Sequence, residues 1–195
     1  MKNEPAITAK TLLPYAAIFT YLAVYFVASA ADLMTTKMAI GSGGSEANVY
    51  VTQAGFYFAA RAWLLTGLGA VAMGSLFAFG LFYARCVVPH WFDHPLASFG
   101  YIYLNPWSRL ERSPLHAISY ANAFVMLRFL AAANNLCIVV GLKSPIGSAV
   151  RAVGHITTPA LGFTLVIGAL YFALVLTLSP TAAKMLRWYI QIIIK

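Results

Sequence analysis

The sequence predicts an all-α integral membrane protein, a four-helix bundle with a C-terminal amphipathic interfacial helix. Of the 195 residues, 61% are hydrophobic and only 9% are charged, and the mean hydropathy is +0.77. About a quarter of the residues in a soluble domain are charged. The 13 basic and 5 acidic residues therefore cannot cover a soluble globule of this size. An aromatic content of 14% also excludes a disordered chain.

The membrane spans are predicted from uninterrupted apolar runs, because a bilayer core about 30 Å thick needs about 20 apolar residues of helix. Four such runs lie at about residues 12–40, 62–83, 118–142 and 159–178. Ser179 and Pro180 are expected to end the fourth span. Residues 181–195 are too short to cross the membrane and mix basic with apolar side chains, so they are expected to form a separate interfacial helix. No second domain is indicated, and residues 1–195 are expected to form one transmembrane domain.

The distribution of Lys and Arg predicts the orientation in the membrane. Eight of them lie in the N-terminus, the second loop and the C-terminal segment: Lys2, Lys10, Arg85, Arg109, Arg112, Lys184, Arg187 and Lys195. The first and third loops hold four: Lys37, Arg61, Lys143 and Arg151. Because basic loops stay on the cytoplasmic side, both termini are expected to be cytoplasmic, in a bacterial inner membrane. The net charge of +8 is expected to face anionic lipid and not nucleic acid, since no Lys/Arg-rich run occurs.

The second span has one face made only of small side chains, Thr66, Ala70, Gly74 and Ala78, at intervals of four residues. Small residues allow two helix backbones to approach closely, and close packing drives helix association in lipid. This face is therefore expected to pack against another helix.

Two ionisable residues are expected to meet inside the membrane. Arg128 lies well within the third span, where a charge is costly without a partner. Asp32 is the only acid near any span, and it shares a stripe of the first helix with Ser29 and Thr36. An Asp32–Arg128 ion pair that brackets two helices is therefore predicted. A proton or ion pathway stays open, as does an Arg128 that contacts lipid headgroups or another subunit.

A short polar motif follows Asp32. Thr35 and Thr36 can bond to backbone carbonyls one turn back. After a Gly-Ser stretch, Glu46 and Asn48 can cap exposed backbone groups. Structural capping is the preferred interpretation, and a ligand or ion site is the alternative.

This D-x-x-T-T pattern, with a glycine-containing turn and E-x-N, resembles a group of small bacterial membrane proteins of unknown function. In that group the asparagine is often followed by proline, whereas here Asn48 is followed by Val49. Asn134 and Asn135 match an asparagine near the end of a later helix in the group. The resemblance covers about 17 residues. It implies a compact four-helix membrane protein and no particular activity.

Residue types that can bind a metal occur in the second loop. His90, Asp93 and His94 are close together in the sequence there, and His116 begins the next helix. Their spacing matches no zinc motif, and the flanking prolines disfavour a helix that presents both loop histidines on one face. No metal and no cofactor is therefore predicted. The chain also lacks the motifs of serine hydrolases, zinc proteases and P-loop enzymes, so no catalytic residue is predicted.

These patterns predict a non-catalytic accessory or structural subunit of a larger bacterial membrane complex. Its expected partners are other integral membrane subunits and membrane lipids, with bound lipid or pigment. Two alternatives stay open. One is a small oligomeric transporter or channel that uses Asp32 and Arg128, and the other is a membrane metal-binding enzyme that uses His90, Asp93 and His94.

Overall fold

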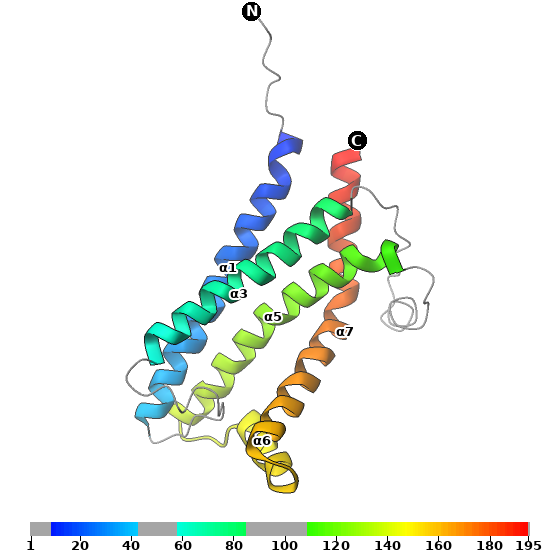
Figure 1. Cartoon of the computed structure of the whole chain (residues 1–195). Coiled ribbons are helices and arrows are strands. Elements are labelled where there is room, and N and C mark those ends of the chain that lie inside the picture. The colour runs from blue at the N-terminus through cyan, green and yellow to red at the C-terminus, as the bar shows by residue number, and fades with distance from the viewer. Residues whose placement is uncertain (1–8, 43–57, 85–108, 195) are drawn as a thin grey trace, which may run out of the picture.

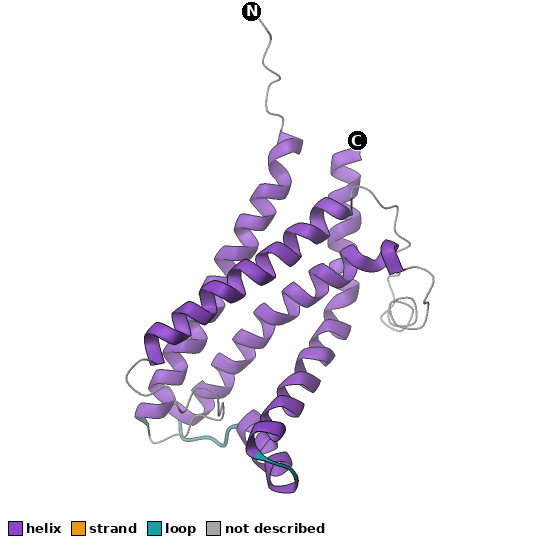
Figure 2. Ribbon diagram, in the orientation of Figure 1, coloured by secondary structure: helices purple, strands orange, loops and turns teal. Residues whose placement is uncertain are grey.

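The computed structural model describes residues 9–42, 58–84 and 109–194, and the elements in these ranges are all α-helices (Figures 1 and 2). They are α1 (Ala9–Gly41), α3 (Phe58–Tyr83), α5 (Arg109–Val139), α6 (Pro145–Ile156) and α7 (Pro159–Ile194). Four of them, α1, α3, α5 and α7, are long and apolar enough to cross a membrane. The predicted all-α class with four candidate spans is confirmed.

The four long helices alternate in direction. Helices α1 and α5 run one way, and α3 and α7 run the other (Figure 1). The start of α1 and the end of α7 consequently lie at the same end of the bundle, here called the terminal end, while α6 lies at the opposite end, here called the α6 end. Helix α5 packs against α1, α3 and α7, so it is the central helix of the bundle.

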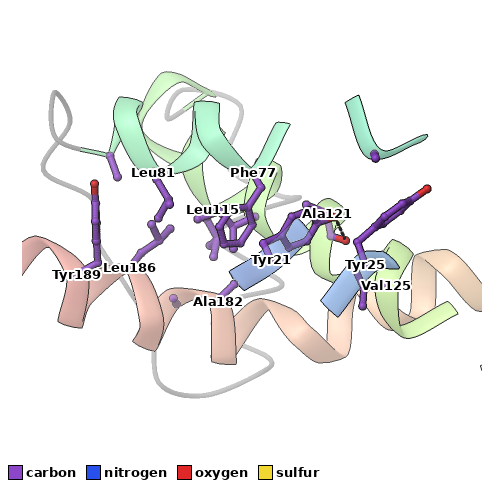
Figure 3. Close-up of a cluster of buried hydrophobic side chains, with 14 of the residues drawn as sticks. Tyr21, Tyr25, Phe77, Leu81, Leu115, Ala121, Val125, Ala182, Leu186 and Tyr189 are labelled. Carbon is purple, nitrogen blue, oxygen red and sulfur yellow. Dashed lines mark hydrogen bonds between the residues drawn. The ribbon is translucent and has the colours of Figure 1, made fainter. Parts of the chain in front are cut away.

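The hydrophobic core lies between all four long helices (Figure 3). Tyr21 of α1 stacks on Phe77 of α3 with ring centroids 4.4 Å apart. Leu81, Leu115 and Leu186 bring α3, α5 and α7 into the same cluster. The surface of the bundle is also apolar, with many large exposed hydrophobic side chains. Such a surface suits a lipid environment, where no charged shell is needed.

The predicted break at Pro180 is wrong, because α7 is one continuous helix of 36 residues with Pro180 inside it. Residues 181–194 are therefore a continuation of α7 and not a separate helix. Their inner face explains this, since Ala182, Ala183, Leu186 and Tyr189 are buried in the core cluster (Figure 3). Burial of that face outweighs the one backbone hydrogen bond that proline removes.

Helix α6 was not predicted, although its start carries a recognisable signal. Ser144 is its N-cap and accepts a hydrogen bond from the Gly147 N–H at 2.9 Å, with Pro145 following as the first helical residue. Helix α6 then packs tightly on α7. A Cβ added at Gly162 would lie 2.6 Å from the backbone nitrogen of Gly154. The third loop is therefore a helical hairpin with backbone-to-backbone contact.

Candidate functional site

The predicted ion pair is present between α1 and α5. Arg128 Nη1 donates to Asp32 Oδ2 at 2.8 Å. The arginine side chain is 24% exposed and the aspartate side chain 13% exposed. An isolated charge in a lipid bilayer is expensive, and pairing with an opposite charge offsets part of that cost. The pair therefore allows two charged residues to lie within candidate membrane spans.

Aromatic rings support the arginine on its own helix. The guanidinium carbon of Arg128 lies 5.5 Å from the centroid of the Phe124 ring, which is a cation–π distance. Phe124 is stacked in turn with Tyr25 of α1, with centroids 6.1 Å apart. The charge thus lies at one end of a short column of aromatic rings between α1 and α5.

A second polar contact joins the same two helices farther toward the α6 end. Asn135 Nδ2 donates to Thr36 Oγ1 at 2.8 Å. Because α1 and α5 run in the same direction, both contacts advance toward the α6 end, by four residues on α1 and by seven residues on α5. We call these four residues the polar seam. Thr35 behaves as expected from sequence, since its hydroxyl donates to the Ala31 carbonyl at 2.8 Å.

Tyrosine hydroxyls extend this helix-to-helix bonding toward the terminal end. Tyr21 Oη donates to the Ala121 carbonyl at 3.0 Å, drawn as a dashed line in Figure 3. Tyr25 Oη donates to the Thr66 carbonyl at 3.0 Å, and Tyr171 Oη donates to the Tyr120 carbonyl at 2.9 Å. Sequence reasoning missed these bonds. The signal available was that Tyr21 and Tyr25 share the stripe of α1 that carries Asp32.

Asn134 and Asn135 are neighbours in sequence with different tasks. The Asn134 side-chain oxygen accepts hydrogen bonds from Ser144 Oγ and from the Ile146 N–H, both at 3.0 Å. It therefore satisfies a free N–H in the first turn of α6. Asn134 fixes α6 to the end of α5, whereas Asn135 fixes α5 to α1.

The small-residue face of α3 does pack against other helices. Thr66 and Ala70 are buried, Gly74 is buried and Ala78 is partly buried. A Cβ added at Gly74 would lie 2.9 Å from Leu22 Cδ2 of α1. The predicted close approach is therefore real at Gly74, and α1 is the helix that approaches.

Several predicted residues lie outside the described part of the chain: Glu46, Asn48, His90, Asp93 and His94. His116 is described, and its ring lies edge-on to Tyr120 of the same helix at 6.2 Å between centroids. Among the described residues, no group of three or more His, Cys, Asp or Glu side chains comes together. The metal alternative thus finds no candidate within those ranges.

The fold is that of the polytopic α-helical membrane proteins, as a class. In the polar seam of this chain, polar groups within candidate spans bond one helix to another. No protein-family model matches the chain, and neither a curated protein nor a solved structure matches it.

Proposed function

We propose that this protein is a non-catalytic accessory subunit of a larger bacterial membrane complex, in which it binds partner helices and lipid or pigment. The polar side chains of the seam support the non-catalytic part of the proposal. Asp32 is engaged by Arg128, and Thr36 is engaged by Asn135. Side chains that hold helices together through short hydrogen bonds are poorly placed to bind and release a substrate.

The outer face of α7 is the observation that carries the partner-binding part. Ala169, Ala173, Thr177 and Thr181 are all exposed and lie four residues apart. This repeats the small-residue spacing that α3 uses inside the bundle, but on a face that no described helix covers. Helix interfaces in membranes are enriched in such residues.

Gly168 strengthens this argument. It is exposed, a Cβ added to it would meet nothing within 4 Å, and its backbone does not have positive φ. Neither packing against the described residues nor backbone conformation requires a glycine there. Glycine within a helix costs about 1 kcal/mol relative to alanine in water. Close contact with a partner helix explains why residue 168 is a glycine.

The test is native-membrane purification of the wild type and two variants in a mild detergent. Gly168→Leu should yield a folded chain in a smaller particle, because the bulky side chain holds a partner helix away. Ala72→Leu is the matched control, since Ala72 is also exposed but lies on α3. The proposal fails if the wild-type particle contains no other stoichiometric subunit, or if both variants leave its mass unchanged.

One specific observation favours a second candidate, a small oligomeric transporter or channel. Asp32 and Arg128 are an intramembrane ion pair that keeps some exposure, 13% and 24% of their side chains. Intramembrane ionisable residues often mark ion or proton paths. This candidate requires that purified wild-type protein in liposomes conducts ions or protons and that Asp32→Asn abolishes the flux.

A further inference from the structure

Two hydroxyl groups, one on α1 and one on α3, are almost completely buried. Ser29 of α1 is 0% exposed and Thr66 of α3 is 1% exposed. Neither Ser29 Oγ nor Thr66 Oγ1 has a hydrogen-bond partner among the described residues. Most buried polar groups in proteins are satisfied by protein or by ordered water, so each of these two needs an explanation.

The register of α1 against α3 places these two residues at about the same level of the bundle. Leu22 faces Gly74, as the close approach to an added Cβ shows. Ser29 lies seven residues after Leu22, about two turns along the same line of α1. Thr66 lies eight residues before Gly74, also about two turns away, on a helix that runs in the opposite direction. These nearly equal steps from one contact bring Ser29 and Thr66 to about the same level.

Tyr25 joins this level to α5. Its hydroxyl donates to the carbonyl of Thr66, and its ring stacks on Phe124 of α5. Ser29 follows Tyr25 by one helical turn and precedes Asp32 by three residues, so all three lie on one face of α1. The two hydroxyls therefore lie where α1, α3 and α5 meet, next to the ion pair.

We infer that Ser29 and Thr66 bind a water molecule buried at this three-helix junction. A buried water typically makes about three hydrogen bonds, and this junction offers three hydroxyl groups, those of Ser29, Thr66 and Tyr25. Ser29 Oγ and Thr66 Oγ1 can each donate or accept, and Tyr25 Oη has an acceptor site left after donating its proton. The bound water would give both the Ser29 and the Thr66 hydroxyl a hydrogen-bond partner close to Asp32.

The local charge favours water over a cation. Asp32 is the only acid of α1, and α3 carries none. Glu111 is the one acid of α5, in its first turn at the terminal end. Since Arg128 already neutralises Asp32, a second cation would gain no unpaired carboxylate and would face the guanidinium.

Thermal unfolding of the full chain in detergent tests this inference. Thr66→Val keeps the side-chain shape and removes the hydroxyl, and Ser29→Ala removes the other. Each change should lower Tm by about 2–4 °C, because the water loses a partner. The double variant should fall no further than the worse single variant, because both lose the same water. A higher or unchanged Tm for Thr66→Val, or additive losses, would overturn the inference.

Ser119 provides the control. It is 0% exposed, its hydroxyl also has no partner among the described residues, and it lies nine residues from Arg128, on the opposite face of α5. Ser119→Ala should leave Tm unchanged or raise it. An equal fall in Tm would show a general effect of hydroxyl removal and would count against the water.

A direct readout covers variants that fail to fold. In wild-type protein reconstituted in liposomes, with ¹³C-labelled threonine methyl groups, solid-state NMR should show polarisation transfer from water to the Thr66 methyl. Absence of that transfer in wild type would overturn the inference even without any variant.

Discussion

At the scale of the residue, polar groups within the spans serve to bond one helix to another. Arg128 reaches Asp32, Asn135 reaches Thr36, and tyrosine hydroxyls reach backbone carbonyls on neighbouring helices. Lipid offers no competing hydrogen-bond partners at this depth, so each such bond is kept once formed. In this protein the polar minority of side chains therefore specifies which helices adjoin and in what register.

The ion pair gives the first prediction. Asp32→Asn and Arg128→Gln should each lower the free energy of unfolding by about 3 kcal/mol, because each leaves a charge without its counter-charge. The double variant should lose less than the sum of the two. Unfolding in detergent, analysed as a double-mutant cycle, measures this coupling. Additive losses would show that the two side chains do not interact.

Asn134 gives the second prediction. Asn134→Ala removes the acceptor for the Ile146 N–H and should cost about 1 kcal/mol, as loss of a helix cap does. Amide hydrogen exchange at Ile146 should become faster. The neighbouring change Asn135→Ala is the control, because it breaks only the bond to Thr36. Equal exchange rates at Ile146 in the two variants would contradict the assigned cap.

At the scale of the element, glycines set how closely helices approach, and tertiary contacts set where helices end. Gly74 admits Leu22 of α1, and Gly162 admits the backbone of α6. Helix α7 continues through Pro180 because the residues beyond it are buried in the core. At these places, packing between helices therefore decides the structure more than local sequence signals such as a proline do.

The α1–α3 interface gives the third prediction. Gly74→Leu should destabilise the fold by about 1–3 kcal/mol, since overpacking a filled interface forces side chains or backbone to shift. Ala72→Leu, on the exposed side of the same helix, should have little effect on folding. Thermal unfolding of both variants in the same detergent checks this. Equal stability would mean that the interface expands freely around the new side chain.

The α6–α7 hairpin gives the fourth prediction. In Gly162→Ala, the new methyl group would lie 2.8 Å from the Val150 carbonyl oxygen, against backbone that has no rotamer to change. Helix α6 should therefore detach and become sensitive to limited proteolysis. Gly168→Ala in the same helix should keep α6 protected, because nothing lies within 4 Å of the added atom. Protection of α6 in both variants would contradict the backbone contact.

At the scale of the whole molecule, the even number of candidate spans determines topology. Four alternating helices return the chain to the terminal end, where α1 begins and α7 ends. The outer surface is largely apolar, and α7 carries a row of exposed small residues on it. Such an arrangement leaves the proposed accessory subunit one distinct face for a partner helix.

Topology gives the fifth prediction. Ser42, which is exposed just after α1 at the α6 end, should be on the side opposite both termini. A Ser42→Cys variant lacking Cys86 and Cys137 should react with a membrane-impermeant thiol reagent from outside the inner membrane, while tags at both termini are accessible only from the cytoplasm. Labelling of Ser42→Cys from the cytoplasm would reverse the proposed orientation.

The sequence by itself determined the membrane class, the approximate spans, the Asp32–Arg128 pair and the close-packing face around Gly74. Each of these depends on local properties: the length of an apolar run, the spacing of residues on a helix face, and the cost of an unpaired charge in lipid. Those properties can be evaluated before any neighbouring helix is placed. Glu46, Asn48 and the loop histidines stay predictions, since they lie outside the described residues.

Only the tertiary structure decided the length of α7, the existence of the α6 hairpin and the division of work between Asn134 and Asn135. In each case the outcome depends on a group far away in sequence. The core buries the residues after Pro180, Gly154 meets Gly162, and Thr36 receives the amide of Asn135. A proline or an asparagine has several local solutions of similar free energy, and packing against another helix selects one of them.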